Sequence, residues 1–175
     1  MSWSPSTLLF AAAFSLALLA APAFAGHALS QDQEKLVAAW LAENKTFRMA
    51  SDIDCDCEKD IQRMRAGYGG DWKPVPDFHP YIVTGDFNGD GVDDFAVVLM
   101  NNANQNNNYA IVVFNGPFVK DTVEPAFVIA GLDLRFQAFF YGPPHIKPYR
   151  LLVGRFGTEG TPLIPSGATY TLDLY

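Results

Sequence analysis

The segment "DFAVVLMNNANQNNNYAIVVF", residues 94–114, decides the fold of this chain. It contains two apolar runs, "FAVVLM" (95–100) and "YAIVVF" (109–114), which have the length of strands and carry apolar side chains on both faces. We therefore expect two central strands that are covered on each side, or by helices on one side and a partner on the other. The polar run between them, "NNANQNNN" (101–108), is expected to form a solvated hairpin loop.

Further apolar runs, bounded by glycine, proline and asparagine, extend the strand pattern on both sides of this segment. The additional expected strands are residues 81–84, 126–130, 134–141, 150–156 and 169–174. The last of these alternates between apolar and polar residues, which is typical of a half-exposed strand at the edge of a sheet. An antiparallel sheet packed by helices that precede it is the economical arrangement of these strands.

Helical periodicity precedes the strands. Ser30 and Gln33 have the spacing of a capping box, in which each side chain satisfies a backbone N–H at the start of a helix. That helix is expected to run to Glu43, and a second, shorter helix is expected over residues 57–66. The predicted fold class is α+β, with the N-terminal helices packed on a mainly antiparallel β-sheet in a single domain of residues 26–175.

The N-terminal segment has the pattern of an export signal. Residues 8–21 form an apolar run rich in Ala and Leu, and the small residues around positions 23–25 follow it. This predicts a signal peptide over residues 1–25 that is cut after Ala25. The mature domain is then expected in the periplasm or outside the cell.

Composition narrows the classes of partner. The formal net charge of −7 makes nucleic acid a poor partner, because the phosphate backbone attracts basic surfaces. After the N-terminal run the sequence has no apolar segment long enough to cross a bilayer, so no membrane span is expected in the mature form.

The segment "TGDFNGDGVDDF", residues 84–95, concentrates acidic side chains between two expected strands. Its oxygen-bearing side chains alternate along the chain so that they can converge on one point, and Gly91 supplies the sharp turn. Oxygen ligands at this density suit calcium, which takes about six to eight of them. The predicted calcium ligands are Asp86, Asn88, Asp90, the backbone carbonyl of Val92, and Asp94. Asp93 points the other way along the strand and is not counted among them.

The spacing of this loop excludes an EF-hand and matches another type of calcium site. An EF-hand needs a bidentate Glu at its twelfth position and a helix on each side, whereas Val97 stands there and both flanks are extended. The pattern DxDxDGxxD over residues 86–94, with Asn88 at its second acidic position, resembles the strand-loop-strand calcium sites of FG-GAP, VCBS and integrin propeller repeats. The chain carries this motif once, so the resemblance implies a calcium site and not the adhesive or carbohydrate-associated functions of those families.

The alternative interpretation of the same loop is an acidic β-turn, because Asn-Gly and Asp-Gly pairs are hairpin signals by themselves. Two carboxylates about 4 Å apart repel each other by about 4 kcal/mol at an effective dielectric constant near 20. A compact loop that holds three carboxylates near one point therefore needs a cation or must splay apart, which favours calcium.

The sequence suggests a structural rather than a catalytic metal. A catalytic ion needs an open position beside a nucleophile or a base, and the chain has no GxSxG, HExxH, CxxC or phosphate-binding glycine motif. The histidines His27, His79 and His145 are scattered. Only His79 is close to the acidic loop in sequence, and His27, near the expected mature terminus, is expected to be disordered.

Cys55 and Cys57 are the only two cysteines, which leaves three alternatives open for an exported chain. They form a disulfide with each other, remain a buried free pair, or serve an intermolecular or metal-binding role. A bridge across one residue closes a small loop, so it restrains the unfolded chain little. A soft-metal site would need two further ligands, and the neighbouring carboxylates are too hard for it.

The segment "MRAGYGGDWKPVPDFHPY", residues 64–81, is rich in aromatic residues and proline. One interpretation is a rigid surface that captures a sugar, a peptide or a protein. The residues of that surface would be Tyr68, Trp72, Phe78, His79 and Tyr81. The favoured interpretation is a connection between the helices and the sheet, fixed to the core by its large rings.

Two functional hypotheses follow. The first is an exported calcium-binding domain that acts as a binding or inhibitory module on another exported protein or a cell-wall glycan, through the aromatic segment or the Asn-rich loop. The alternative is a metal-assisted hydrolase in the periplasm or outside the cell, in which Asp86, Asp90 or Asp94 takes part in the chemistry.

Overall fold

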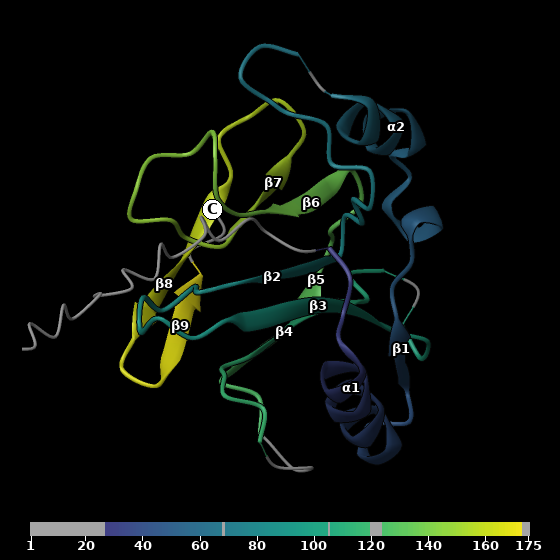
Figure 1. Ribbon diagram of the computed structural model, residues 1–175. Coiled ribbons are helices and arrows are strands. Elements are labelled where there is room, and N and C mark those ends of the chain that lie inside the picture. Colours follow the sequence, from purple (N-terminus) through teal and green to yellow (C-terminus); the bar gives the residue numbers. More distant parts are fainter. Residues whose placement is uncertain (1–26, 68, 105, 120–123, 173–175) are drawn as a thin grey trace, which may run out of the picture.

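The structure, a computed structural model, describes residues 27–67, 69–104, 106–119 and 124–172. Most of its elements are strands, which form two antiparallel sheets (Figure 1). The helices are α1 (Gln31–Glu43) and α2 (Glu58–Ala66), with a single 3-10 turn, η1 (Asp52–Cys55). The predicted signal peptide lies outside the described residues. Within those residues, no helix combines the length and the apolar character needed to cross a bilayer.

The first sheet is built around its longest strand, β3. Its strands are β1 (Phe47–Met49), β2 (Ile82–Gly85), β3 (Asp94–Asn101), β4 (Tyr109–Phe114) and β5 (Phe127–Leu132), in the order β1-β3-β4-β5. β2 and β1 share one edge of β3: β2 pairs with its first half, where Gly85 faces Asp94, and β1 pairs with its second half, where Met49 faces Leu99. The β2–β3 connection therefore leaves the sheet at the start of its central strand.

The second sheet contains the C-terminal strands. These are β6 (Gln137–Phe140), β7 (Leu152–Arg155), β8 (Thr161–Ser166) and β9 (Thr169–Leu172), in sequential order. β8 pairs with β7 only through Thr161 and Pro162, and with β9 through the residues that follow. Each part of β8 thus has a ladder on one side, which lets the strand accept Pro162 and Pro165 despite their missing N–H groups.

Both faces of β3 and β4 are buried, each in a different apolar cluster. Alternate side chains of a strand point to opposite faces, so residues 95, 97 and 99 enter one cluster and residues 96 and 98 enter the other. The first cluster contains Leu36, Val37, Phe95, Val97, Leu99, Ala110, Val112 and Phe114. The second and larger cluster joins β2, β3 and β4 to the second sheet and α2, and includes Val83, Val98, Ile111, Phe139, Val153, Leu163, Ile61 and Met64.

The predicted α+β class, with helices packed on one sheet, is wrong, because the described chain is mainly β and two sheets share its larger core. The strands after residue 136 close into a second sheet and cover the face of β3 and β4 that the prediction left to helices or a partner. An apolar face can be covered equally well by a sheet or by helices, so the pattern of β3 and β4 did not distinguish the two.

Several local predictions are confirmed. The capping box of α1 is present, with Ser30 N–H bonded to Gln33 Oε1 (2.8 Å) and Gln33 N–H bonded to Ser30 Oγ (3.4 Å). The expected strands correspond to β2–β7 and β9, although residues 134–136 belong to a turn rather than to β6. Two strands were missed: β1 has three residues, and β8 contains the two prolines.

Candidate functional site

The loop between β2 and β3 folds back on the carboxylate of Asp86. Asp86 Oδ1 accepts hydrogen bonds from the backbone N–H groups of Gly89 (2.7 Å) and Asp90 (3.0 Å). Asp86 Oδ2 accepts a third from Gly91 (3.0 Å). Gly89 and Gly91 have φ angles of 85° and 86°, in the left-handed region that glycine adopts without a Cβ clash. These two glycines let the backbone direct its N–H groups at the negative charge.

Asn88 and Asp90 extend the same network. Asn88 Oδ1 accepts the Asp90 N–H (2.8 Å), and Asn88 Nδ2 donates to Asp90 Oδ2 (3.0 Å). Asp90 Oδ1 accepts the N–H of Val92 (2.8 Å). Every side-chain oxygen of Asp86, Asn88 and Asp90 therefore accepts an N–H of the loop itself.

Asp94, the last of the predicted ligands, is fully buried, with 0% of its surface exposed. Its Oδ2 accepts the N–H of Phe87 (2.9 Å), and its Oδ1 accepts the N–H of Gly116 (3.1 Å). The Tyr170 hydroxyl on β9 lies 3.3 Å from Asp94 Oδ2 and 2.8 Å from Asn115 Oδ1. Burial raises the pKa of the Asp94 carboxyl, against the opposing effect of the Gly116 and Phe87 N–H groups. This carboxyl joins the loop, the end of β4 and the second sheet.

The structure thus brings the predicted calcium ligands onto one loop and holds their side-chain oxygens with N–H donors. In the part of the chain that the structure describes, no group of three or more His, Cys, Asp or Glu side chains has the arrangement of a metal site. A calcium ion would require Asp86, Asn88 and Asp90 to exchange N–H contacts for metal contacts. Tyr141 fixes the start of the loop, because its hydroxyl donates to the Asp86 carbonyl (2.7 Å).

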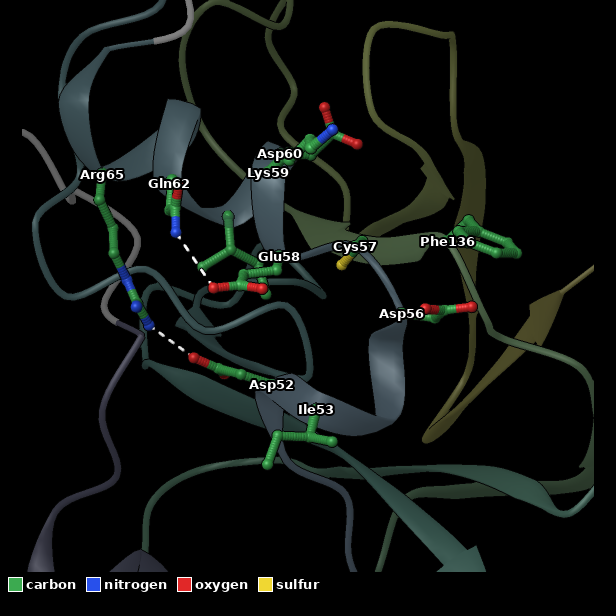
Figure 2. Close-up of a pocket in the computed structure, with 11 residues that line it drawn as sticks. Asp52, Ile53, Asp56, Cys57, Glu58, Lys59, Asp60, Gln62, Arg65 and Phe136 are labelled. Atoms are coloured by element: carbon green, nitrogen blue, oxygen red, sulfur yellow. Dashed lines mark hydrogen bonds and ion pairs between the residues drawn. The ribbon is translucent and has the colours of Figure 1, made fainter.

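A second acidic region, formed by η1, α2 and Phe136, surrounds an open groove of about 750 Å³ (Figure 2). Two bulky apolar side chains face solvent there: Ile53 is 90% exposed and Phe136 is 46% exposed. The lining also contains four carboxylates, those of Asp52, Asp56, Glu58 and Asp60, and the cations Lys59 and Arg65. In Figure 2, Phe136 and Asp56 lie at one side of the groove and Arg65 lies at the other.

The turn that carries Ile53 is held firmly on both sides. Arg48 donates two hydrogen bonds to Asp54, at 2.7 and 2.8 Å, and this contact is the main cause that lowers the pKa of Asp54 to about 2. The Tyr109 hydroxyl donates to the Asp54 carbonyl (2.6 Å). On the other side of Ile53, Asp52 accepts from Arg65 (2.6 Å). Ile53 therefore points outward between two tethered carboxylates.

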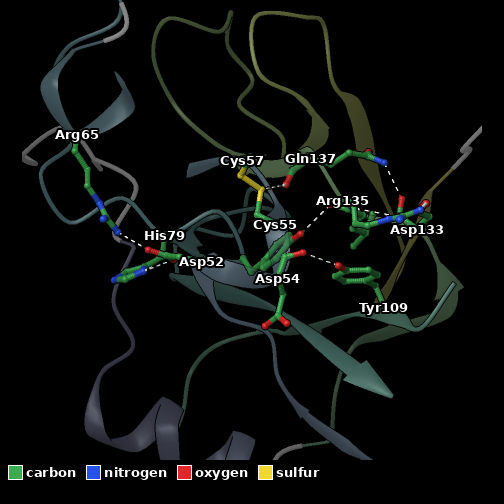
Figure 3. Close-up of a disulfide and its surroundings, with 12 residues drawn as sticks. Asp52, Asp54, Cys55, Cys57, Arg65, His79, Tyr109, Asp133, Arg135 and Gln137 are labelled. Atoms are coloured by element: carbon green, nitrogen blue, oxygen red, sulfur yellow. Dashed lines mark hydrogen bonds and ion pairs between the residues drawn. A yellow bond between two sulfur atoms is a disulfide. The ribbon is translucent and has the colours of Figure 1, made fainter. Parts of the chain in front are cut away.

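A disulfide between Cys55 and Cys57 closes the turn from η1 into α2 (Figure 3). This is the first of the three alternatives that the sequence left open. The Phe136 N–H donates to the Cys55 carbonyl (2.7 Å), which connects the groove wall to the disulfide segment. Phe136 has a φ angle of 62°, in the left-handed region that costs a non-glycine residue about 1–2 kcal/mol. The surrounding contacts hold this aromatic ring at the edge of the groove.

The predicted aromatic ligand surface does not form as a continuous surface. Phe78 and Tyr81 are core residues, 0% and 2% exposed, because the second sheet covers them. The ring of Trp72, which is partly buried, packs edge-on against Phe140 and His145. Tyr68 lies outside the described residues. The favoured interpretation, a connection fixed to the core by its rings, accounts for Phe78 and Tyr81.

His27 and His79 have polar partners within the fold. His79 Nδ1 lies 2.8 Å from Asp52 Oδ1, so Asp52 links His79 to Arg65 rather than to the β2–β3 loop. His27, which was expected to be disordered, is buried against β2, with Nδ1 2.9 Å from the Ile82 carbonyl oxygen and 3.2 Å from that of His79. Burial lowers the pKa of His27, which favours the neutral ring.

Sequence reasoning missed the groove and its two apolar residues. Ile53 had a weak signal, a bulky apolar residue inside the acidic run "DIDCDC". Phe136 had none, because a left-handed aromatic residue in a turn is indistinguishable in sequence from a strand residue, and residues 134–141 were expected to form one strand.

Comparison with known proteins gives this chain no relatives: no protein-family model, no curated protein and no solved structure matches it. Its function must therefore be inferred from the geometry of the groove and the loop.

Proposed function

We propose that this chain is an exported binding or inhibitory module that acts through the η1–α2 groove, and that calcium binding at the β2–β3 loop has a structural role. The observation that carries the binding function is the preformed groove, about 750 Å³ in volume, with Ile53 and Phe136 facing solvent. Bulky apolar side chains exposed on the lining of a solvent-open groove are typical of an interaction site.

The rigidity of the groove supports this function. Asp54 is fixed by Arg48 and Tyr109, and Cys55 is fixed by its disulfide and by Phe136. A surface that is already ordered loses little conformational entropy when a partner binds, so more of the contact energy contributes to affinity. The groove therefore has the physical properties of a binding site that does not need to fold on its ligand.

Selection of phage-displayed random heptapeptides on the immobilised protein tests the binding function. Peptides enriched on the parent should bind the Ile53→Ser variant at least about tenfold more weakly, because the substitution removes an exposed apolar anchor. Ile146→Ser is the matched control, since Ile146 is 89% exposed and lies outside the groove. Peptides that bind the parent and Ile53→Ser equally well would contradict the assignment of this groove.

The calcium site is proposed from the DxDxDGxxD pattern and from the crowding of carboxylates in one short loop. Three carboxylates and one amide, those of Asp86, Asp90, Asp94 and Asn88, lie within nine residues. A structural role is favoured over metal-assisted hydrolysis, because Asp94 is buried and both of its oxygens are engaged with the loop, β4 and β9. A cation held in part by this carboxyl would stabilise the junction of the loop with the two sheets.

Calorimetric titration of calcium into metal-stripped protein tests this site. The parent should bind calcium, and Asp90→Ala should abolish the heat of binding by removing a central carboxylate. Asp93→Ala is the matched control, because Asp93 is an exposed acidic residue of the same loop that is outside the predicted ligand set. Equal heats for the parent and Asp90→Ala would show that the loop is an acidic hairpin turn without a specific metal.

Export is proposed from the N-terminal sequence, and the disulfide supports it because such bonds persist in oxidising compartments. Mass spectrometry of protein recovered from the periplasm or the medium should give Gly26 as its first residue. Protein that retains Met1 and remains in the cytosol would contradict the assignment.

A further inference from the structure

We infer that the η1–α2 groove binds a cationic segment of another exported protein, one that carries lysine or arginine beside a bulky apolar residue. This inference rests on the proposed binding function and names the class of partner.

The charge of the lining gives the first reason. Four carboxylates line the groove against two cations, which leaves two negative charges in excess. Arg65 is already committed, because it bonds to Asp52 and to the Phe78 carbonyl. Arg63 lies 3.5 Å from Asp60 on α2, and Arg135, which precedes Phe136, pairs with Asp133. When Arg63, Arg135 and Asp133 are counted as well, five carboxylates face four cations, so one negative charge remains in excess. A partner of complementary, positive charge is attracted by this field and a negative one is repelled.

The position of the apolar side chains gives the second reason. Ile53 lies in the chain between Asp52 and Asp54, whose carboxylates are held by Arg65 and Arg48. Figure 2 shows Phe136 and Asp56 on the same side of the groove. Each apolar contact therefore has a carboxylate as its neighbour. A ligand that fills the groove must offer an apolar group and a cationic group a short distance apart, and adjacent amino-acid side chains do this.

The same chemistry argues against a neutral glycan as the ligand. Sugar rings stack on aromatic faces and bond to polar groups, whereas this groove presents one partly exposed aromatic ring, that of Phe136, and an excess of carboxylates. A neutral glycan would not compensate the net negative charge of the groove lining.

The experiment uses the heptapeptide pool selected on the parent protein. Its sequences should be enriched in lysine or arginine next to Leu, Ile, Phe or Trp. A labelled synthetic peptide from this pool should bind about tenfold more weakly to Asp56→Asn with Glu58→Gln, and affinity should fall as salt rises. Asp71→Asn with Glu159→Gln is the matched control, since it removes the same charge from exposed positions outside the groove.

The outcomes separate this inference from the proposed function. Acidic or uncharged peptides that still depend on Ile53 would overturn the cationic partner and leave the binding module intact. Equal binding to the parent and to the Asp56→Asn with Glu58→Gln variant would also overturn it. Two outcomes would overturn the assignment of this groove to a protein partner. One is equal affinity of the peptides for the parent and for Ile53→Ser, and the other is a soluble cell-wall glycan fragment as the sole ligand of the groove.

Discussion

The β2–β3 loop and the η1–α2 segment are both short and acidic, but their carboxylates have different partners. In the loop, the backbone N–H groups of residues 87–92 and 116 donate to the carboxylates of Asp86, Asp90 and Asp94. In η1–α2, Arg48 and Arg65 hold two carboxylates, and others line an open groove. Local backbone geometry explains the difference: Gly89 and Gly91 allow the chain to curl over its own side chains.

Two segments of similar acidic composition thus have different roles. Carboxylates that accept backbone N–H groups stabilise the domain. Carboxylates beside exposed apolar side chains form a surface that a partner can bind. Substitutions in the loop should therefore change stability, and substitutions on the groove surface should change binding.

The largest effect is expected for Asp94→Ala. This change leaves the Phe87 and Gly116 N–H groups without an acceptor in a buried place, which should lower the free energy of unfolding by about 3–4 kcal/mol. Urea unfolding in the presence of a chelator measures it, and Asp93→Ala should change the same quantity by less than about 0.5 kcal/mol. A loss below about 1 kcal/mol for Asp94→Ala would show that the loop is not fixed through this carboxyl.

Calcium should have the next largest effect. Because the unfolded chain cannot assemble the ligands, a free concentration about 100 times the dissociation constant should add about 2.7 kcal/mol, which raises the melting temperature by about 5–10 °C. Thermal unfolding with calcium and then with chelator measures the change. Asp90→Ala should melt at the same temperature in both conditions, and a shift as large as that of the parent would contradict the proposed ligands.

Arg48→Ala should destabilise the protein by about 2 kcal/mol at neutral pH, since it leaves the mostly buried Asp54 carboxylate without its charged partner. The effect depends on pH with a definite sign. The pKa of Asp54 is lowered to about 2 in the folded state, so its contribution is present above the unfolded pKa near 4 and is lost as pH falls toward 2. Urea unfolding of the parent and the variant at pH 7, 5 and 3 should therefore give curves that converge at the acidic end. A difference that stays constant over this range would show that the ion pair is not its source.

The smallest change in stability is expected for Phe136→Gly. Glycine adopts the φ angle of 62° without strain, and this gain offsets the partial loss of buried surface, so the free energy of unfolding should stay within about 1 kcal/mol of the parent. Peptide affinity at the groove should nevertheless fall by about tenfold. Loss of the fold instead of the affinity would assign Phe136 to the core.

The sequence was informative where one local pattern has one structural solution. The capping box and the apolar spacing of residues 31–43 predicted α1, and the apolar runs at 95–100 and 109–114 predicted the central strands β3 and β4. Each of these depends on residues close together along the chain. The calcium site expected over Asp86 to Asp94 stays a prediction.

The rest depends on contacts between distant residues. The second sheet was not recognised because its strands are short and β8 is interrupted by Pro162 and Pro165. The burial of the Asp94 carboxyl and the outward orientation of Ile53 involve more distant partners: Gly116 lies 22 residues from Asp94, and Arg65 lies 13 residues from Asp52. Composition shows that charge is present, and it does not show which groups will neutralise it.

The contact of Tyr170 with Asp94 and Asn115 has a consequence for how the domain opens. A hydroxyl of the second sheet reaches a buried polar cluster of the first, so parting the sheets breaks the contacts of Tyr170 with Asp94 and Asn115. Together with the shared apolar core, this makes the two sheets one cooperative unit. The amide protons of β3 and β9 should exchange with solvent at the same free energy, through global unfolding and not through separate release of the C-terminal hairpin.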